Sequence, residues 1–335
     1  MHAPMGEAAA ATVTVVIPTR DRPELLRRAV RSVLGQQYAG RVECLVVVDS
    51  PDAPLPDLTD LLPDLLPDQL PDQLPGQLPD QLPGAGPRDV RALRNGRTPG
   101  LAGTRNTGYL AAEGTYLASC DDDDEWLPGK LTAQVALIEE HPGTSLVATG
   151  IVVHLAGRDM PRDAEPRPLY FEDFLADRRM EVHPSTYLTR RSAVVTGFGL
   201  VDEQIPGGYA EDYEWLLRAA RTGPVRCVPQ RLVRVHWHEG SFFTSRWQMI
   251  DEALTWLLER VPEFSTVPRG LGRVEGQLAF ANAALGRRRV ALGWAGRALR
   301  HHPTSPQAWA SLPIASGLVS ADRVVALARR RGRGV

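Results

Sequence analysis

Four short apolar runs, rich in valine and other strand-forming residues, alternate with helical patterns in the first part of the chain. Such runs are typical of strands that are buried on both faces of a parallel sheet. Two of the connections carry the apolar stripe of an amphipathic helix, which gives a β-α-β order twice. That order predicts an α/β protein with a doubly wound, mostly parallel sheet. The expected strands are 12–18, 42–48, 89–93 and 115–120, and the expected helices are 23–37 and 101–112.

The fourth strand leads directly into a run of consecutive aspartates, residues 121–124, which Trp126 and Pro128 follow. Adjacent carboxylates repel one another, so a folded chain rarely keeps such a run at a strand end without a cation. Carboxylate oxygens suit Mg²⁺ or Mn²⁺, and the carboxyl end of the strands is where ligands bind in an open α/β sheet. The alternative interpretation is a solvated acidic loop.

A proline-rich insert of low complexity, residues 51–87, separates the second strand from the third. Proline recurs at every fourth residue from Pro63 to Pro83, which excludes a regular helix or an interior strand. We expect a disordered or polyproline-like surface loop. A role in partner binding is an alternative, although repeat expansion in a tolerant loop is the simpler explanation.

The second half of the chain changes from mixed structure to helix. The sequence predicts helices over 131–140 and 211–221, strands over 145–154 and 183–188, a polar loop over 158–167 and a β ribbon over 225–237. Beyond residue 245 the pattern is wholly helical. Within it, residues 277–312 resemble one tetratricopeptide-type hairpin and the start of another. One repeat is not stable alone, so we expect it to pack on the rest of the protein.

Composition excludes several classes of protein. The formal net charge is −2, which gives no indication of a nucleic-acid partner. We find no apolar run long enough for a transmembrane helix and no signal-peptide pattern, and we expect residues 1–11 to be flexible. Cys44, Cys120 and Cys227 lie apart in strand-like runs, which indicates buried apolar side chains in a reducing cytoplasm. The expected location is therefore cytoplasmic.

The carboxyl-terminal segment is strongly basic. Between residues 267 and 335, twelve arginines face only two acidic residues, Glu275 and Asp322. One interpretation is a solvated basic face, and the other is a peripheral contact with an anionic membrane or an acidic partner.

Five motifs in this order resemble the family 2 glycosyltransferases, which have the GT-A nucleotide-sugar-binding fold. They are Val-Val-Ile-Pro-Thr (15–19), Val-Val-Val-Asp (46–49), Gly-Thr-Arg-Asn-Thr-Gly (103–108), the acidic run, and Ala-Glu-Asp-Tyr-Glu-Trp (210–215). The resemblance implies a GT-A domain over 12–243 and a helical, tetratricopeptide-like region over 244–335. It also implies metal-dependent, inverting transfer of a sugar from a nucleoside diphosphate sugar, with a UDP-sugar expected first, to an acceptor hydroxyl.

The resemblance assigns the donor nucleotide to Pro18, Thr19 and Asp49, which end the first two strands. It assigns the diphosphate side of the donor to Arg105 and Asn106, together with Asp121. An arginine near a helix start suits a diphosphate, because the guanidinium and the free backbone N–H groups both favour anions. The alternative interpretation is a surface arginine with Asn106 as a local cap.

For the metal, the resemblance implies an Asp-x-Asp-Asp motif whose register is fixed by Pro128. Asp121, Asp123 and Asp124 then occupy motif positions, and we expect Asp123 to contact Mn²⁺ or Mg²⁺ directly. His238 fits the position of a histidine that the family places near the metal and the diphosphate. The cation would neutralise charge on the leaving nucleoside diphosphate.

By the same resemblance, Asp212 is the general base that takes the proton of the acceptor hydroxyl, with Glu211 as a supporting acid. The alternative is that both only favour the amino end of a helix. Two other functions are alternatives to sugar transfer. A sugar nucleotidyltransferase carries a Gly-rich loop with Arg and Lys after its first strand, which this chain lacks. A catalytically silent scaffold is disfavoured by the intact acidic motifs. The acceptor (a cell-surface glycan, lipid-linked precursor, natural product or peptide) and the oligomeric state stay open.

Overall fold

The computed structural model describes residues 10–50, 52–61, 85–237 and 246–330. Most of the expected flexible amino terminus, most of the proline-rich insert and the candidate ligand His238 therefore lie outside the described residues. The chain divides into two compact units. The first comprises Met1–Leu169, Arg179–Val201 and Arg218–Trp237, and the second comprises Tyr170–Arg178, Asp202–Leu217 and His238–Val335.

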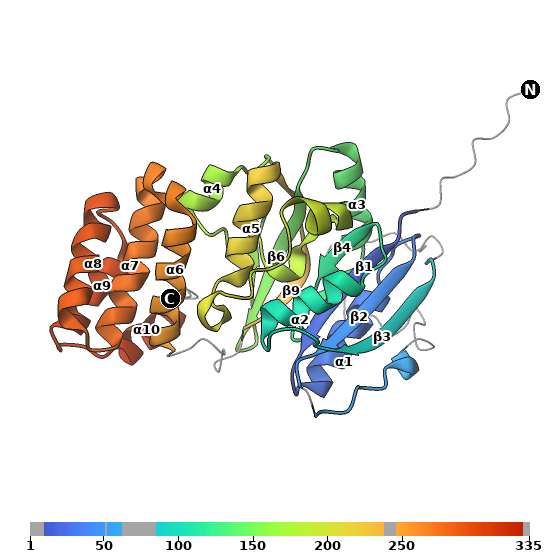
Figure 1. Cartoon of the computed structure of the whole chain (residues 1–335), viewed down its shortest axis with the longest axis horizontal. Helices are drawn as coiled ribbons and strands as arrows, with labels where there is room; N and C mark the ends of the chain where they lie inside the picture. Colours follow the sequence, from blue (N-terminus) through green and yellow to red (C-terminus); the bar gives the residue numbers. More distant parts are fainter. Residues whose placement is uncertain (1–9, 51, 62–84, 238–245, 331–335) are drawn as a thin grey trace, which may run out of the picture. The chain divides into compact units, whose positions relative to one another are not determined.

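A curled mixed sheet of nine strands, counted over the described residues, forms the first unit (Figure 1). Its first four strands are parallel and lie in the order β3-β2-β1-β4, which confirms the predicted doubly wound start. The remaining strands continue the order as β8-β6-β9-β5, with β7 paired to β6. The strands are β1 (Val13–Thr19), β2 (Val42–Val48), β3 (Arg88–Arg94), β4 (Tyr116–Ser119), β5 (Glu125–Trp126), β6 (Leu146–Leu155), β7 (Arg158–Arg162), β8 (Leu188–Arg190) and β9 (Val225–His236).

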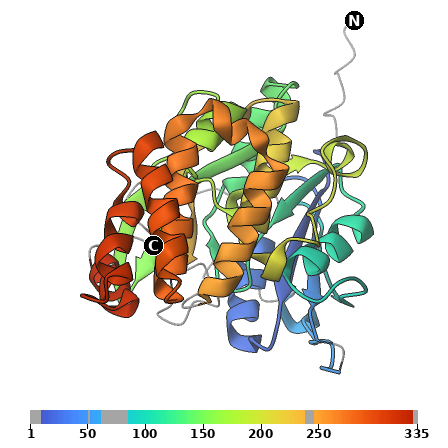
Figure 2. The ribbon, with the colours of Figure 1, turned by 60° about the vertical axis from the view of Figure 1, so that its left-hand side comes forward.

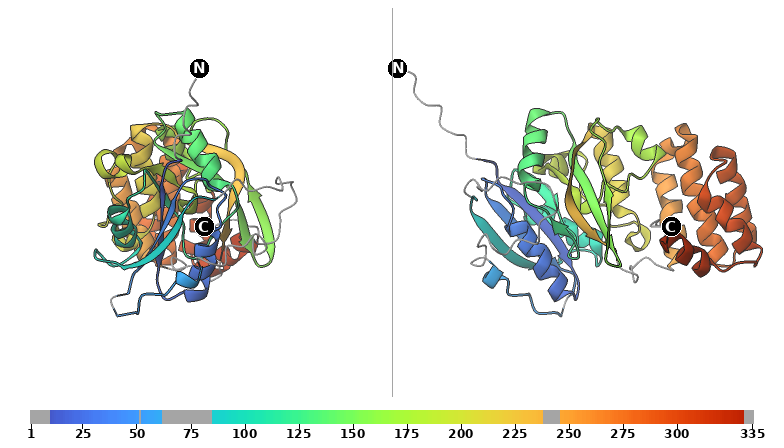
Figure 3. Two further views of the ribbon diagram at one scale, coloured as in Figure 1. Left: turned by 90° about the vertical axis from the view of Figure 1, so that its right-hand side faces the viewer. Right: turned by 180° about the vertical axis from the view of Figure 1, so that it is seen from behind.

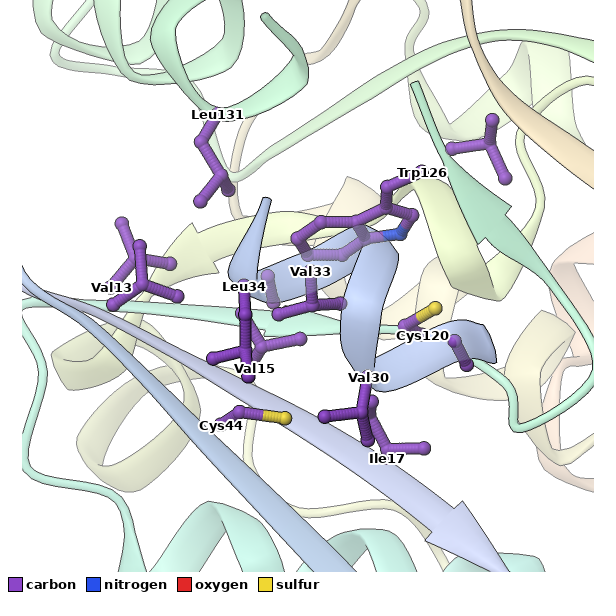
Figure 4. Packing of buried hydrophobic residues seen from close by; sticks show 14 of the residues in the cluster. Val13, Val15, Ile17, Val30, Val33, Leu34, Cys44, Cys120, Trp126 and Leu131 are labelled. Atoms are coloured by element: carbon purple, nitrogen blue, oxygen red, sulfur yellow. The ribbon is translucent and has the colours of Figure 1, made fainter. Parts of the chain in front are cut away.

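The main core lies between the sheet and helix α1 (Pro23–Leu34). Proline at the first helical position starts α1 without losing a hydrogen bond, because that N–H has no partner in a helix. Alternate residues of β1, Val13, Val15 and Ile17, point toward the apolar face of α1 (Figure 4). Cys44 and Cys120 lie in the same core, and all three cysteines are buried and free, as the sequence predicted.

The opposite face of the same strands carries helix α2 (Leu101–Ala111). Val16 lies between Val15 and Ile17 on β1 and therefore points away from α1. A Cβ atom at Gly108 of α2 would lie only 2.4 Å from Cγ1 of Val16, so only glycine permits this approach. The right-hand view of Figure 3 shows β1, β2 and β3 side by side. The close approach fixes α2, and with it Arg105 and Asn106, above the carboxyl ends of the strands.

Replacing Gly108 by alanine should lower the melting temperature by several degrees, which corresponds to roughly 1–3 kcal/mol of strain in an overpacked core. Val16 is fully buried and β-branched, so it has no free rotamer that relieves the contact. Gly293→Ala is the matched control, because that helical glycine has nothing within 4 Å of the added methyl group. Calorimetry that gives both variants the same melting temperature would exclude the packing role of Gly108.

Three predicted elements differ from the structure. The strand expected over 183–188 is wrong: a 3-10 turn, η3 (Pro184–Thr186), comes first, because Pro184 cannot donate to a strand ladder, and β8 begins at Leu188. The polar loop expected over 158–167 contains β7, which forms a hairpin with β6 through Ala156 and Gly157, both at positive φ. The predicted β ribbon is one strand, β9, which runs parallel to β6 with a bulge.

The described start of the proline-rich insert also departs from the prediction of a surface loop. Leu58 and Leu61 are buried in the main core; Leu61 ends a 3-10 turn, η1 (Thr59–Leu61), and Leu58 directly precedes that turn. Asp60 pairs with Arg27 of α1. The described start of the insert, residues 52–61, therefore packs in part on the core.

The second unit is helical throughout its described part, as the sequence predicted for the residues beyond 245. Helices α7 and α8 form the expected hairpin, and α9 packs against both (Figure 2). Glu275 of α7 is buried and holds Arg297 (3.1 Å) and His301 (2.7 Å) of α8. The helices are α4 (Phe171–Ala176), α6 (Trp247–Arg260), α7 (Pro268–Ala284), α8 (Arg288–His301), α9 (Pro306–Ala315) and α10 (Ala321–Arg330), with the start of α5 (Glu211–Thr222).

Among the described helices, none combines the length and the apolar character that crossing a bilayer requires. The membrane contact of the basic carboxyl-terminal segment stays a prediction.

Candidate active site

The acidic run forms a tight turn at the carboxyl end of β4, beside the ends of β1 and β2. The backbone N–H of Asp124 donates to the carbonyl oxygen of Asp121 (3.1 Å), so residues 121 and 124 come together across the turn. Thr19, the last residue of β1, donates its hydroxyl to Asp122 (2.7 Å). Pro18 lies buried within β1 and pairs with Val47 of β2 in the parallel ladder. The structure thus brings the predicted nucleotide residues of β1 to the acidic turn.

Burial gives the turn an unusual proton affinity. It raises the pKa of Asp123 to about 6, with a further contribution from the like charges of Asp121 and Asp122. Burial also raises the pKa of Asp124 well above its usual range. Two arginines offset part of this charge: Arg105 lies 2.7 Å from Asp121, and Arg22 lies 3.2 Å from Asp122 and 2.9 Å from Asp123. Such excess negative charge in a buried turn favours the binding of a cation.

Three side chains of the first unit converge as a candidate metal site. One ligand atom each from Asp121, Asp124 and His183 lies within 4.8 Å of the others. Ser185 orients Asp124 by donating its hydroxyl to Oδ2 (2.5 Å), and the backbone N–H of His236 donates to Oδ1 (3.1 Å). Two carboxylates and an imidazole are donors that Mn²⁺ accepts readily, so the residues present fit the predicted metal.

The position of Asp123 differs from that of its two neighbours in the turn. Its carboxylate pairs with Arg22 and is not part of the three-residue cluster. Sequence reasoning missed His183, because residues 183–188 were interpreted as a strand. The proline directly after His183 was the available signal, since an X-Pro pair breaks a strand and frees the preceding side chain for a turn.

Arg105 and Asn106 lie in the second turn of α2, and both side chains are buried. Arg105 extends to Asp121 at 2.7 Å, so the predicted diphosphate residue touches the candidate metal site. The alternative of a surface arginine is therefore wrong. Asn106 does not cap the helix: its amide donates to the carbonyl oxygen of Val201 (2.8 Å) and accepts from the N–H of Val201 (2.9 Å). It fastens that backbone to α2.

Asp49 follows β2 and fastens the loop that precedes α2. Its two carboxylate oxygens accept from the side-chain amide of Asn95 (2.8 Å) and the backbone N–H of Gly100 (2.9 Å). The side chain retains 11% of its exposure, so it stays open at one side. Asp49 therefore connects the carboxyl end of β2, where the nucleotide is predicted to bind, to the loop that precedes α2 and Arg105.

The only lysine of the chain packs against Trp126, which follows the acidic turn. Lys130, the first residue of α3 (Lys130–Glu140), is fully buried, donates to Gln134 (2.7 Å) and lies 3.7 Å from the centre of the Trp126 ring. Trp126 in turn donates its indole N–H to the carbonyl oxygen of Ser185 (2.8 Å). The indole face favours a cation, but the loss of hydration outweighs it, and burial lowers the pKa of Lys130 to about 7.

Lys130→Met should flatten the dependence of stability on pH. Between pH 7 and 10.5 the unfolded chain binds a proton that the folded chain has released, so the free energy of unfolding rises with pH. This group contributes up to about 1.4 kcal/mol per pH unit in that window, and methionine contributes nothing. Urea titrations of both proteins between pH 7 and pH 9 measure the difference in slope. Equal slopes would show that Lys130 is charged in the fold.

In the second unit, the predicted base and its neighbour begin α5. The preceding residues Gly207, Gly208 and Ala210 all have positive φ, which turns the chain sharply into the helix. Glu211 is buried, and both oxygens of Asp212 lie 2.9 Å from Nη2 of Arg178. No motif points to Arg178, which lies 34 residues from Asp212 along the chain.

The fold has close counterparts among solved structures. The chain superposes on TarS 1–349 of S. aureus, solved in complex with UDP-GlcNAc, with a TM-score of 0.55 at 15% identity, covering 96% of this chain and 92% of that one. It superposes on the mannosyltransferase PcManGT of Pyrobaculum calidifontis, solved with GDP-Man and Mn²⁺, with a TM-score of 0.52 at 16% identity, covering 98% and 82%. The expected GT-A-type fold is confirmed.

The family follows from the sequence match. Residues 14–194, over half of the chain, match the model of glycosyl transferase family 2, and the chain belongs to that family. A stretch of 124 residues is 27% identical to the putative colanic acid biosynthesis glycosyl transferase WcaA of Escherichia coli (strain K12). That match spans 37% of this chain and 37% of WcaA, so it covers little more than a third of the relative. Membership of a glycosyltransferase family decides against the sugar nucleotidyltransferase.

Proposed function

We propose that this protein transfers a sugar from a nucleoside diphosphate sugar to an acceptor hydroxyl, with inversion at the anomeric carbon and with Mn²⁺ or Mg²⁺ as cofactor. The observation that carries the proposal is the cluster of Asp121, Asp124 and His183 beside the buried Arg105. Two similar proteins support the proposal: TarS was solved with UDP-GlcNAc, and PcManGT was solved with GDP-Man and Mn²⁺. WcaA supports a role in polysaccharide biosynthesis.

The residues of the first unit have separate tasks in this proposal. Thr19 and Asp49, at the ends of β1 and β2, bind the nucleoside. Arg105, whose guanidinium is held by Asp121 at 2.7 Å, binds the diphosphate. Asp121, Asp124 and His183 hold the cation, which, when bound, neutralises negative charge on the departing diphosphate. Asp123 stays a predicted ligand, although its carboxylate is engaged by Arg22 in this structure.

Asp212 of the second unit is the proposed general base, and Glu211 the supporting acid. As the acceptor oxygen forms its bond to the anomeric carbon, the bond from that carbon to the diphosphate oxygen breaks. The acceptor proton passes to the Asp212 carboxylate, and the electron pair of the broken bond leaves with the nucleoside diphosphate. One displacement of this kind inverts the anomeric configuration, whereas a covalent intermediate would retain it.

The proposal is tested by titration calorimetry with UDP-GlcNAc, UDP-glucose and GDP-mannose, each with and without Mn²⁺. We expect one donor to bind and its affinity to fall on removal of the metal. Proton NMR of the first product formed, from transfer or from slow hydrolysis, should show the anomeric configuration opposite to that of the donor. Binding of no donor would contradict nucleotide-sugar transfer, and a product of retained configuration would contradict the direct displacement.

A further inference from the structure

Arg178 makes a close charged contact with the proposed base. It follows α4, and its Nη2 lies 2.9 Å from Oδ1 and 2.9 Å from Oδ2 of Asp212. The two side chains belong to the same unit. The arginine side chain is 34% exposed and the aspartate 16%, so the pair is partly shielded from water but open on one side. A cationic nitrogen placed between both oxygens holds the carboxylate toward Arg178 and favours its ionised form.

The arginine itself is held by an aromatic side chain of α5. Its guanidinium carbon lies 5.7 Å from the centre of the Tyr213 ring, within the range of a cation–π contact. The Tyr213 hydroxyl donates to the carbonyl oxygen of Phe174 in α4 (2.5 Å) and accepts from Arg273 of α7 (2.8 Å). The end of α4 is thus fastened to the start of α5, which keeps Arg178 next to Asp212.

Other charged and titratable groups surround the pair, and they come from several elements. Those on α5 and the loop before it, and those that face it from α4 and α7, are Tyr209, Glu211, Tyr213, Glu214, Asp177 and Arg273. Three of these are carboxylates, which titrate in the acid range as Asp212 does. An acid limb in a pH profile is therefore assigned to Asp212 only with a variant of that residue.

We propose that Arg178 is a positioning residue for the base, which orients the Asp212 carboxylate and keeps it ionised until the acceptor is in place. The inference rests on the proposed function, because it assigns a role through Asp212. When one carboxylate oxygen of Asp212 takes the acceptor proton, that oxygen loses its contact with Arg178, while the other oxygen keeps its contact. Arg178 therefore lowers the basicity of the Asp212 carboxylate but holds the carboxylate in one orientation.

The experiment compares Arg178→Met and Arg178→Gln, which remove the charge, with Arg178→Lys, which keeps it. The rate of nucleoside diphosphate release is measured across pH with Mn²⁺ and the donor that binds. We expect the acid limb of kcat/KM to move up by about one to three pH units in the neutral variants and to stay near its original position in the lysine variant. Donor affinity by calorimetry should not change.

Coupling to Asp212 is tested in the double variant. Arg178→Met in an Asp212→Ala background should cause no further loss of rate, because the residue through which Arg178 acts is already gone. Arg287→Met is the matched control, since it removes an arginine that pairs with Asp251 (3.0 Å) in the same unit. We expect its pH profile to match that of the unmodified protein. Circular dichroism identifies variants that fold, and Arg178→Gln serves if the methionine variant does not.

Two results would overturn the role of Arg178: an acid limb that stays in place in both neutral variants, or losses that multiply in the double variant. Failure of the proposed function looks different. If Asp212→Ala alone keeps the full rate, Asp212 is not the base, whatever Arg178 does.

Discussion

Asp124→Asn should lower the rate of sugar transfer by at least about 100-fold and remove the stabilisation of the protein by Mn²⁺. The reason is that Asp124 supplies one of the three converging ligand atoms, and an amide is a poorer ligand than a carboxylate. The fold should survive, because Oδ1 of asparagine can still accept from the N–H of His236 while its amide donates to Ser185. The measurements are nucleoside diphosphate release and the melting temperature with and without Mn²⁺.

For the same variant we also predict the stability of the metal-free protein. Burial raises the pKa of Asp124 well above its usual range, so the ionised side chain costs stability when no cation is bound. Above that pKa, the neutral asparagine should therefore give a melting temperature at least as high as that of the unmodified metal-free protein. Asp122→Asn is the control, because Asp122 contacts Thr19 and Arg22 but is not part of the metal cluster. If the Asp124 variant still gains stability from Mn²⁺ and the Asp122 variant does not, the metal site has been assigned to the wrong residues.

Asp212→Asn should lower kcat by about 10²–10⁴-fold while donor affinity and the response to Mn²⁺ are unchanged. Asparagine keeps the shape of the side chain but cannot take a proton from the acceptor. Azide needs no deprotonation, so sodium azide should restore part of the rate and yield a glycosyl azide, which NMR detects together with its anomeric configuration. If azide raises the rate of the Asp212→Asn variant, the variant has lost the base but has kept its fold.

The matched control is Asp202→Asn, which alters another carboxylate of the same unit; among the described residues it accepts a hydrogen bond from the backbone N–H of Gln204 alone (2.8 Å). Its rate should equal that of the unmodified protein. An Asp212 variant that is slow and is not accelerated by azide would indicate a structural role for this residue instead of proton transfer.

The regular elements were predictable because each depends on residues that are close in sequence. The run at 42–48 is strand β2 as predicted, and the helix expected over 23–37 is α1, which ends three residues early at Leu34. Period and burial agree in both, since β-branched runs pack between helices and apolar stripes face the sheet. Prediction was wrong at 183–188, where Pro184 begins a 3-10 turn instead of a strand.

The contacts of the candidate site were not predictable, because they join residues far apart in the chain. Ser185 orients Asp124 across 61 residues, and Arg178 holds Asp212 across 34. Neither partner lies in a motif, and a serine or an arginine in a loop carries no local sign of what it will contact. Lys130 is a similar case: a lysine at a helix start suggests exposure, yet the fold buries it against Trp126.

The acidic run shows how the two sources of information divide. The sequence by itself determined that a parallel sheet is present, that carboxylates follow its fourth strand, and that these residues resemble the metal motif of the family 2 glycosyltransferases. Only the tertiary structure decided which carboxylates converge. The turn closed by the bond from Asp124 N–H to the Asp121 carbonyl brings side chains 121 and 124 to His183, while Asp123 turns to Arg22. Spacing along the chain cannot show this, because the direction of each side chain in a turn depends on backbone angles and on partners from distant segments.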